Sequence, residues 1–222
     1  MQLNVIVEKL EKELKQLFQS ESSGHDIHHL KRTMNLSLKI QESEGGDRLV
    51  VGVSSLLHDI HRIIEKETGV YCTPKQSLTK IKEIIEKSEI ELSAEQISKI
   101  LHCIEFHEEY NFSTAGKTVN DLETLILQDA DNLEASGAIG IGRTFAFGGA
   151  HSATMWDPEV PLGRNIYNDS INDTSTINHF YSKLLKLKDN MNTLTAKEMA
   201  NERHKFMELF LKEFFDEWNG QK

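Results

Sequence analysis

The strongest constraint on the fold is a spacing of apolar residues that repeats every three to four positions along most of the chain. This period matches the turn of an α-helix, in which residues i, i+3 and i+4 lie on one face. Only three prolines occur in the 222 residues, and the alternating pattern of strands is scarce. The sequence therefore predicts an all-α protein. Helices are expected at about residues 2–19, 26–42, 47–63, 75–88, 94–109, 120–135, 137–146, 176–190 and 195–218.

One long segment departs from this pattern. Residues 148–175 hold two of the three prolines and many turn-forming residues, and C-terminal helices are expected after them, at about 176–218. Loops of this length often cover a functional site, although this one could also simply bridge two helices. A length of 222 residues is compatible with one core. We therefore expect a single domain spanning residues 1–222.

Composition excludes several classes of protein. The formal net charge of −10 opposes broad electrostatic binding of duplex nucleic acid. No stretch approaches the roughly 20 apolar residues of a membrane span, and the N-terminus lacks the pattern of a secretory signal. We therefore expect a cytoplasmic protein with neither a membrane nor duplex nucleic acid as partner. Apolar residues on the last helix are compatible with a homodimer.

Histidine and aspartate residues form the most informative clusters. The apolar run SSLL ends at His58 and Asp59. A buried carboxylate needs a cation nearby, and a metal ion would satisfy both side chains. Neighbouring helical residues project about 100° apart, so other segments must supply further ligands. His29, at the margin of an apolar helix face, is one candidate. Asp129 and Asp131 in the QDAD segment are others, and spacing alone does not choose between them.

These residues resemble the H…HD…D signature of the HD-domain metal-dependent phosphohydrolase superfamily. The segments GHDIHHLKR, HCIEFH, QDADNLEASGAIGIGR and HFYSKLL are similar to motifs of one bacterial subgroup, over about residues 24–210. The resemblance implies an HD-domain helical bundle with additional C-terminal helices. It also implies that the second aspartate of QDAD is the ligand, so that the metal ligands are His29, His58, Asp59 and Asp131. Asp129 is then expected to orient a ligand or to accept a proton.

Two imidazoles and two carboxylates suit manganese, iron, magnesium or zinc, and the resemblance favours manganese. An ion so held can activate a bound water for attack on phosphorus and can offset charge on phosphoryl oxygens. Further groups must contact the remaining phosphate oxygens. The match implies that His102, His107, Arg143 and Lys183 are candidates for these contacts. We expect catalytic roles for His102, His107 and Asp129, and substrate contacts from Arg143, His179 and Lys183.

Other roles remain open for each of these residues. His102 and His107 could be polar residues on a helix, or could hold a second ion, as the resemblance to some HD proteins implies. Arg143 could be a surface cation at a helix C-terminus. His179 and Lys183, four residues apart, share a helix face that could lie beside a packing surface. The pair His25–Asp26, at the expected start of a helix, is interpreted as a cap outside the metal shell.

Departures from related families narrow the substrate. The chain lacks the Glu-Asp pair that hydrolases of guanosine tetraphosphate carry after the His-Asp pair, and it lacks the GYP element of cyclic-di-GMP phosphodiesterases. Asn132 stands where many relatives have arginine. The resemblance implies a pyrophosphohydrolase that acts on nucleoside triphosphates. The alternatives are a phosphomonoesterase acting on nucleotides or other small phosphates, and a non-catalytic nucleotide-binding regulatory module.

Overall fold

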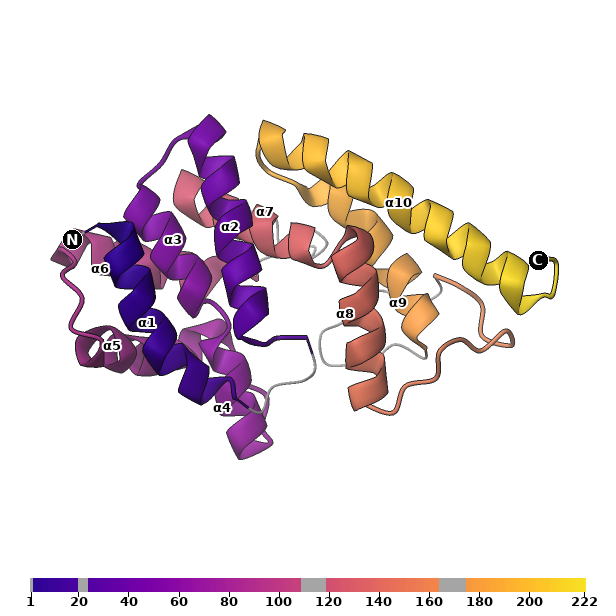
Figure 1. The fold of residues 1–222 in the computed structure, drawn as a ribbon, viewed down its shortest axis with the longest axis horizontal. Helices are drawn as coiled ribbons and strands as arrows, with labels where there is room; N and C mark the ends of the chain where they lie inside the picture. The colour runs from indigo at the N-terminus through magenta and orange to yellow at the C-terminus, as the bar shows by residue number, and fades with distance from the viewer. Residues whose placement is uncertain (1, 20–23, 109–118, 164–174) are drawn as a thin grey trace. The chain divides into compact units, whose positions relative to one another are not determined.

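The computed structural model describes residues 2–19, 24–108, 119–163 and 175–222, and within these ranges it contains helices and no β-strand, which confirms the all-α prediction (Figure 1). The α-helices are α1 (Leu3–Leu17), α2 (Ile27–Glu44), α3 (Arg48–Leu57), α4 (Ile60–Thr68), α5 (Leu78–Lys87), α6 (Ala94–Phe106), α7 (Leu122–Glu134), α8 (Gly137–Ala150), α9 (Thr176–Ser182) and α10 (Leu194–Trp218). Two 3₁₀-helices are η1 (Pro74–Ser77) and η2 (Leu184–Asn190).

The chain forms two compact units. The N-terminal unit comprises Met1–Glu21 and His25–Asp131, and the C-terminal unit comprises Ser22–Gly24 and Asn132–Lys222. The boundary near Asp131 falls inside α7, so this helix contributes residues to both units. The single domain expected from the sequence stays a prediction.

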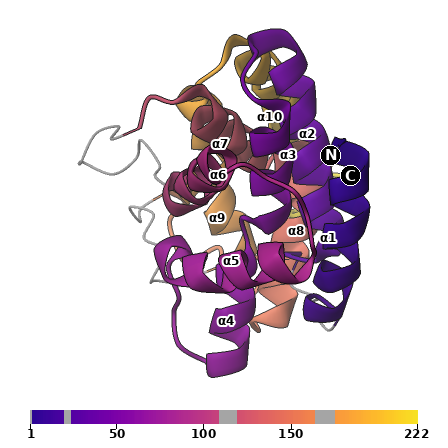
Figure 2. The same cartoon turned by 90° about the vertical axis from the view of Figure 1, so that its left-hand side faces the viewer.

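Helix α3 is the centre of the N-terminal unit, where it packs against α1, α2 and α6 (Figure 2). Every residue from Val50 to Leu57 is buried. A helix that is apolar on all sides requires such a position, because no face of it can be left in water. Asp47 caps its N-terminus by accepting hydrogen bonds from the backbone N–H groups of Leu49 and Val50. The apolar run that ends at His58 is thus held rigidly in the core.

The helix expected over 47–63 is in fact two helices. Helix α3 ends at Leu57 and α4 begins at Ile60, and between them Asp59 has φ −93° and ψ 15°, outside the helical region. The apolar pattern continues on both sides of this break, so periodicity could not reveal it. The break places His58 and Asp59 at the end of one helix and the start of the next.

The helix expected over 176–190 is also divided. The backbone of Lys183, with φ −130° and ψ −63°, ends α9, and η2 follows as a 3₁₀-helix. In a 3₁₀-helix residues i and i+3 project in the same direction. Leu184 and Leu187 are three residues apart and both are buried. The tighter helix therefore turns both leucines into the core of the C-terminal unit.

In the C-terminal unit, α10 packs against α8 and η2. Phe145 of α8 contacts Phe210 and Phe214 of α10 through their rings. The same helix exposes Phe206 and Leu209. The homodimer suggested by such residues stays a prediction.

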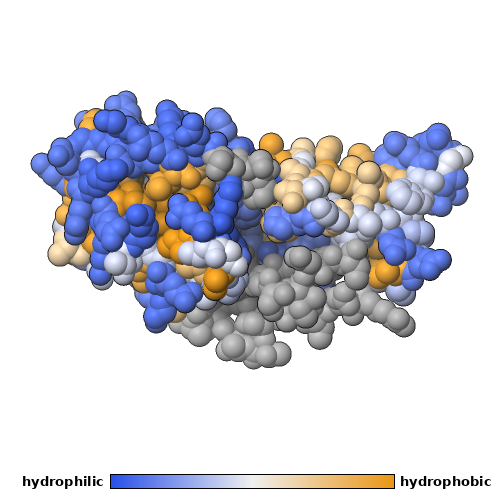
Figure 3. All heavy atoms as spheres, turned by 90° about the horizontal axis from the view of Figure 1, so that it is seen from below, coloured by the Kyte–Doolittle hydropathy of each residue, from blue (hydrophilic) through white to orange (hydrophobic). Residues whose placement is uncertain are grey.

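The segment 148–175 is partly helical, because α8 extends to Ala150 rather than ending near 146. Turns follow as far as residue 163, and residues 164–174 lie outside the described ranges. A role for this segment as a lid stays a prediction. No described helix is both long enough and apolar enough to cross a membrane. On the face drawn in Figure 3, hydrophilic side chains cover much of the N-terminal unit, with apolar ones visible between them.

Candidate metal centre

Four side chains converge in the N-terminal unit. His29 comes from α2, His58 and Asp59 lie between α3 and α4, and Asp131 comes from α7. His29 Nε2 lies 3.2 Å from His58 Nε2, 3.2 Å from Asp59 Oδ2 and 3.5 Å from Asp131 Oδ1. His58 Nε2 lies 3.6 Å from Asp59 Oδ2 and 3.7 Å from Asp131 Oδ1. The structure therefore brings together the four residues that the sequence predicts as metal ligands.

These separations fit the coordination shell of one small ion. Ligand atoms about 2.1 Å from an ion lie about 3.0 Å apart in octahedral geometry and about 3.4 Å apart in tetrahedral geometry. The five measured separations, from 3.2 to 3.7 Å, are close to these values. The donor set contains two imidazole nitrogens and two carboxylate oxygens, which suits a divalent cation. The residues present therefore fit a divalent metal ion.

Hydrogen bonds on the far side of each ring orient the histidines. His58 Nδ1 lies 2.8 Å from the carbonyl oxygen of Ser55, so Nδ1 is the donor, and in the neutral ring that binds a metal Nε2 carries the lone pair. His29 Nδ1 lies 3.4 Å from the hydroxyl of Thr33. Support of this kind fixes the tautomer and the ring orientation of metal-binding histidines. Both Nε2 atoms are thus turned toward the two carboxylates.

The carboxylates of the cluster are ionised in spite of their burial. Burial acts to raise the pKa of Asp59, but His58, His25 and His29 outweigh it and hold that pKa well below its usual value. Burial opposes ionisation of Asp131 too, and His58 and His29 lower its pKa. For His58, burial alone would lower the pKa, but Asp59 and Asp131 raise it to about 9. In the metal-free protein, imidazolium charge therefore balances the two carboxylates.

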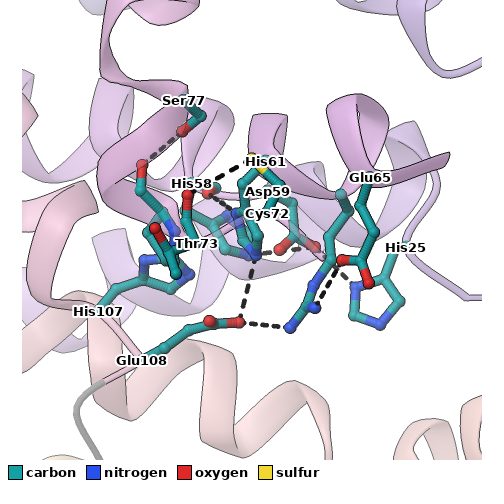
Figure 4. A network of polar contacts seen from close by, with 12 residues as sticks. His25, His58, Asp59, His61, Glu65, Cys72, Thr73, Ser77, His107 and Glu108 are labelled. Atoms are coloured by element: carbon teal, nitrogen blue, oxygen red, sulfur yellow. Dashed lines mark hydrogen bonds and ion pairs between the residues drawn. The ribbon is translucent and has the colours of Figure 1, made fainter. Parts of the chain in front are cut away.

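His25 and Asp26 have different contacts. Asp26 caps α2 as expected, because its Oδ1 accepts a hydrogen bond of 2.8 Å from the backbone N–H of His29. His25 contacts the centre, and a role for it in capping this helix stays a prediction. Its Nδ1 lies 2.8 Å from Asp59 Oδ2, and its side chain is 27% exposed (Figure 4). Its spacing of four from His29 is the sequence signal that could have indicated a shared face.

His107 and His102 lie in different surroundings. His107 is buried, and one of its nitrogens lies within 4.8 Å of ligand atoms of both His58 and Asp59. Its Nδ1 donates to the carbonyl of Ile104 over 2.7 Å, and its buried Nε2 has no hydrogen-bond partner among the described residues. His102 is exposed, and its Nε2 lies 3.0 Å from Asp121 Oδ2. The structure brings His107, but not His102, to the cluster.

A second group of polar residues borders the centre and was not assigned from the sequence (Figure 4). His61 is fully buried; its Nδ1 donates to the carbonyl of His58 over 3.1 Å, and its Nε2 lies 3.4 Å from Glu108 Oε1. Glu108 also pairs with Arg62 over 2.5 Å. Burial acts to raise the pKa of Glu108, but His61 and Arg62 lower it strongly. The i, i+3 spacing of His58 and His61 is the signal that could have revealed this group.

Asp129 is fully buried on α7, two residues before Asp131. Burial of this kind is compatible with its expected role beside a ligand, which stays a prediction. Among the residues expected to contact phosphate, Arg143 donates from Nε to the carbonyl of Gly24 over 2.8 Å. His179 and Lys183 are half-buried, in α9 and just after it. Arg143, His179 and Lys183 all belong to the C-terminal unit.

Comparisons with known proteins identify relatives of this chain. Residues 26–136 match the HD domain family. The protein YpgQ of Bacillus subtilis (strain 168) is 34% identical over 196 residues, which cover 87% of this chain and 84% of YpgQ. The crystal structure of an HD-superfamily hydrolase from Bacillus thuringiensis has a TM-score of 0.68 and 35% identity, and the match covers 96% of this chain and 98% of that one.

The crystal structure of Bacillus subtilis YpgQ in complex with ADP has a TM-score of 0.64 and 31% identity, and the match covers 93% of this chain and 96% of that one. The matched residues 26–136 contain all four converging side chains. The chain therefore belongs to the HD domain family, in agreement with its sequence motifs.

Proposed function

We propose that the protein is a metal-dependent pyrophosphohydrolase that cleaves nucleoside triphosphates into a nucleoside monophosphate and pyrophosphate. The observation that carries this proposal is the convergence of His29, His58, Asp59 and Asp131, in which each histidine Nε2 lies 3.2 to 3.7 Å from the other Nε2 and from an oxygen of each carboxylate. The ADP bound to the related YpgQ supports a nucleotide as the ligand. A hydrolase from the same family supports water as the second reactant.

The four converging side chains hold the ion, for which we propose Mn²⁺ ahead of Mg²⁺, Fe²⁺ or Zn²⁺. When bound, such an ion supplies positive charge for phosphoryl oxygens and lowers the pKa of a coordinated water. His29 and His58 bind through Nε2 because hydrogen bonds involve their Nδ1 atoms. Asp59 and Asp131 supply negative charge that holds the ion in the largely buried centre.

His107 has the geometry of an acceptor. Since its Nδ1–H donates to Ile104, its Nε2 carries a lone pair and cannot donate to a phosphate oxygen in the neutral form. Burial lowers the pKa of His107 to about 4, so the ring is neutral near pH 7. We therefore assign His107 Nε2 to accepting a hydrogen bond from the water that attacks phosphorus, and so to orienting that water.

The remaining roles rest on the sequence motifs. Arg143, His179 and Lys183 are proposed to contact the phosphates, because cations and hydrogen-bond donors stabilise charge on the phosphoryl oxygens. Asp129 is proposed to support a metal ligand. The catalytic role expected for His102 stays a prediction, and its pairing with Asp121 gives it no added support.

A product assay tests the proposal. Metal-free protein is loaded with Mn²⁺ and incubated with a panel of nucleoside triphosphates, diphosphates and monophosphates, and pyrophosphate and phosphate are measured separately. Release of pyrophosphate and monophosphate from triphosphates, lost in Asp59→Asn, is the expected result. Release of phosphate from monophosphates only would show a phosphomonoesterase. Tight nucleotide binding without turnover would show a regulatory module.

A further inference from the structure

His25 is the most exposed of the residues gathered at the centre. Its side chain is 27% exposed, whereas those of His29 and His58 are fully buried and that of Asp59 is 4% exposed. His25 directly precedes the Asp26 cap of α2, and its ring lies edge-on to that of His29, with centroids 5.4 Å apart. Two histidines from the start of one helix therefore reach the same aspartate.

The distance from His25 to Asp59 is that of a hydrogen bond. Nδ1 of His25 lies 2.8 Å from Asp59 Oδ2, which is typical of a direct N–H···O bond to a carboxylate. The Nε2 atoms of His29 and His58 lie 3.2 Å from each other and 3.2 to 3.7 Å from the carboxylate oxygens of Asp59 and Asp131, as atoms that share an ion do. His25, His29 and Asp59 also lie close enough to hold an ion together. The shorter distance to Asp59 assigns His25 as a hydrogen-bond donor to this carboxylate rather than as another ligand.

The oxygen that His25 contacts is also the oxygen that faces the other two histidines. Oδ2 of Asp59 lies 3.2 Å from His29 Nε2 and 3.6 Å from His58 Nε2. A carboxylate oxygen has two lone pairs, so it can accept one hydrogen bond and still bind an ion. Without the bond to His25, the carboxylate of Asp59 could rotate about its terminal bond and turn Oδ2 away from the centre.

We propose that His25 is a positioning residue of the metal centre: its Nδ1–H holds Asp59 Oδ2 toward His29 and His58, and thereby sets the affinity of the centre for its ion. This inference rests on the metal centre of the proposed function and is independent of the nucleotide substrate. His25 acts through Asp59 and makes no bond to the ion.

The test measures binding of Mn²⁺ to metal-free protein by electron paramagnetic resonance of the free ion. His25→Ala removes the donor. His25→Asn keeps an amide N–H close to the position of Nδ1, and His25→Gln moves the amide one carbon farther along the side chain. His28→Ala is the matched control, because His28 is exposed on the same helix. The melting temperature of each metal-free variant reports on folding.

Loss of a bond that supports a metal ligand weakens binding by about 10- to 100-fold, and we expect this for His25→Ala and His25→Gln. His25→Asn and His28→Ala are expected to bind Mn²⁺ within about threefold of the unchanged protein, because the donor is kept. Equal affinity in His25→Ala and the unchanged protein would overturn the proposal. Affinity of His25→Asn as low as that of His25→Ala would also overturn it.

The result is separable from the proposed activity. If triphosphates are not hydrolysed but the variants show the expected order of Mn²⁺ affinity, the substrate proposal fails and the role of His25 stands. If hydrolysis is confirmed and Mn²⁺ affinity does not depend on His25, the role of His25 fails alone.

Discussion

Each compact unit contains a buried histidine beside a carboxylate, and the two groups are built differently. In the N-terminal unit, His29 and His58 face Asp59 and Asp131. In the C-terminal unit, His204 Nε2 lies 3.2 Å from Glu208 Oε1 and 3.0 Å from the ammonium group of Lys188.

The difference lies in the source of positive charge. The C-terminal group contains a lysine, and its Glu208 is 62% exposed, so water and Lys188 can balance the carboxylate. In the N-terminal group the largest favourable effects on the pKa values of Asp59 and Asp131 come from histidines. Histidines can bind a metal only after they give up their protons. The N-terminal group therefore has the donor set of a metal centre, whereas the C-terminal group balances its carboxylate with a lysine and water.

The largest effect is expected from removing a ligand. Asp59→Ala or His58→Ala deletes a direct bond to the ion, so metal retention and hydrolysis should fall together, by more than about 10³-fold in activity. Elemental analysis after purification without chelator, with kinetics at saturating Mn²⁺, measures both. His204→Ala is the control from the other group and should retain the metal. Full metal content in Asp59→Ala would contradict the proposal that the N-terminal group, unlike the C-terminal one, binds a metal ion.

The second effect is a loss of metal affinity at low pH. The pKa of His58, raised to about 9, means that this ring is protonated near neutral pH in the metal-free protein. Its proton stabilises the metal-free fold below pH about 6.5, and this stabilisation is lost as the pH rises through about 9.

Mn²⁺ must displace that proton. The affinity of the centre for Mn²⁺ should therefore fall about tenfold for each pH unit below 9, and more steeply where other ligands also become protonated. Calorimetry in buffers of different ionisation enthalpy should show about one proton released per ion near pH 7. Binding without proton release would mean that His58 is already neutral.

A third variant separates the ion from the substrate. Lys183→Ala should leave Mn²⁺ content unchanged and raise the KM for a nucleoside triphosphate about tenfold, because a charged hydrogen bond to phosphate contributes roughly 1.5 kcal/mol or more. Lys186→Ala, on the exposed side of η2, is the matched control. Loss of metal in Lys183→Ala would place that residue with the ligands instead.

The smallest effect is expected in the C-terminal group. Lys188→Ala removes the cation beside His204 and should lower the free energy of unfolding by about 1 kcal/mol. Metal content and hydrolysis should not change, because one histidine and an exposed glutamate are too few ligands. Urea denaturation measures the change. Binding of Mn²⁺ to His204 and Glu208 in this variant would contradict this expectation, because it would show that only Lys188 prevents an ion from binding there.

Periodicity predicted most helices because their apolar residues recur every three to four positions, and the resemblance predicted the four residues that converge. The break between α3 and α4 was missed, since the residues on both sides of His58 and Asp59 are apolar. The division at Lys183 was missed because the spacing of Leu184 and Leu187 is compatible with either type of helix. The contact from His25 to Asp59 joins residues 34 positions apart, and only the fold reveals it.

Three histidines make the same local hydrogen bond. His58, His61 and His107 each donate from Nδ1 to the carbonyl three residues earlier, and each thereby presents Nε2 outward. Such carbonyls belong to the main chain, so residues of any type can provide them. The side chains of Ser55 and Ile104 can therefore drift during evolution without altering the tautomer of the histidine that each supports. A homologue with a different residue at position 55 or 104 should therefore keep the same histidine tautomer, provided that the new side chain fits the buried position.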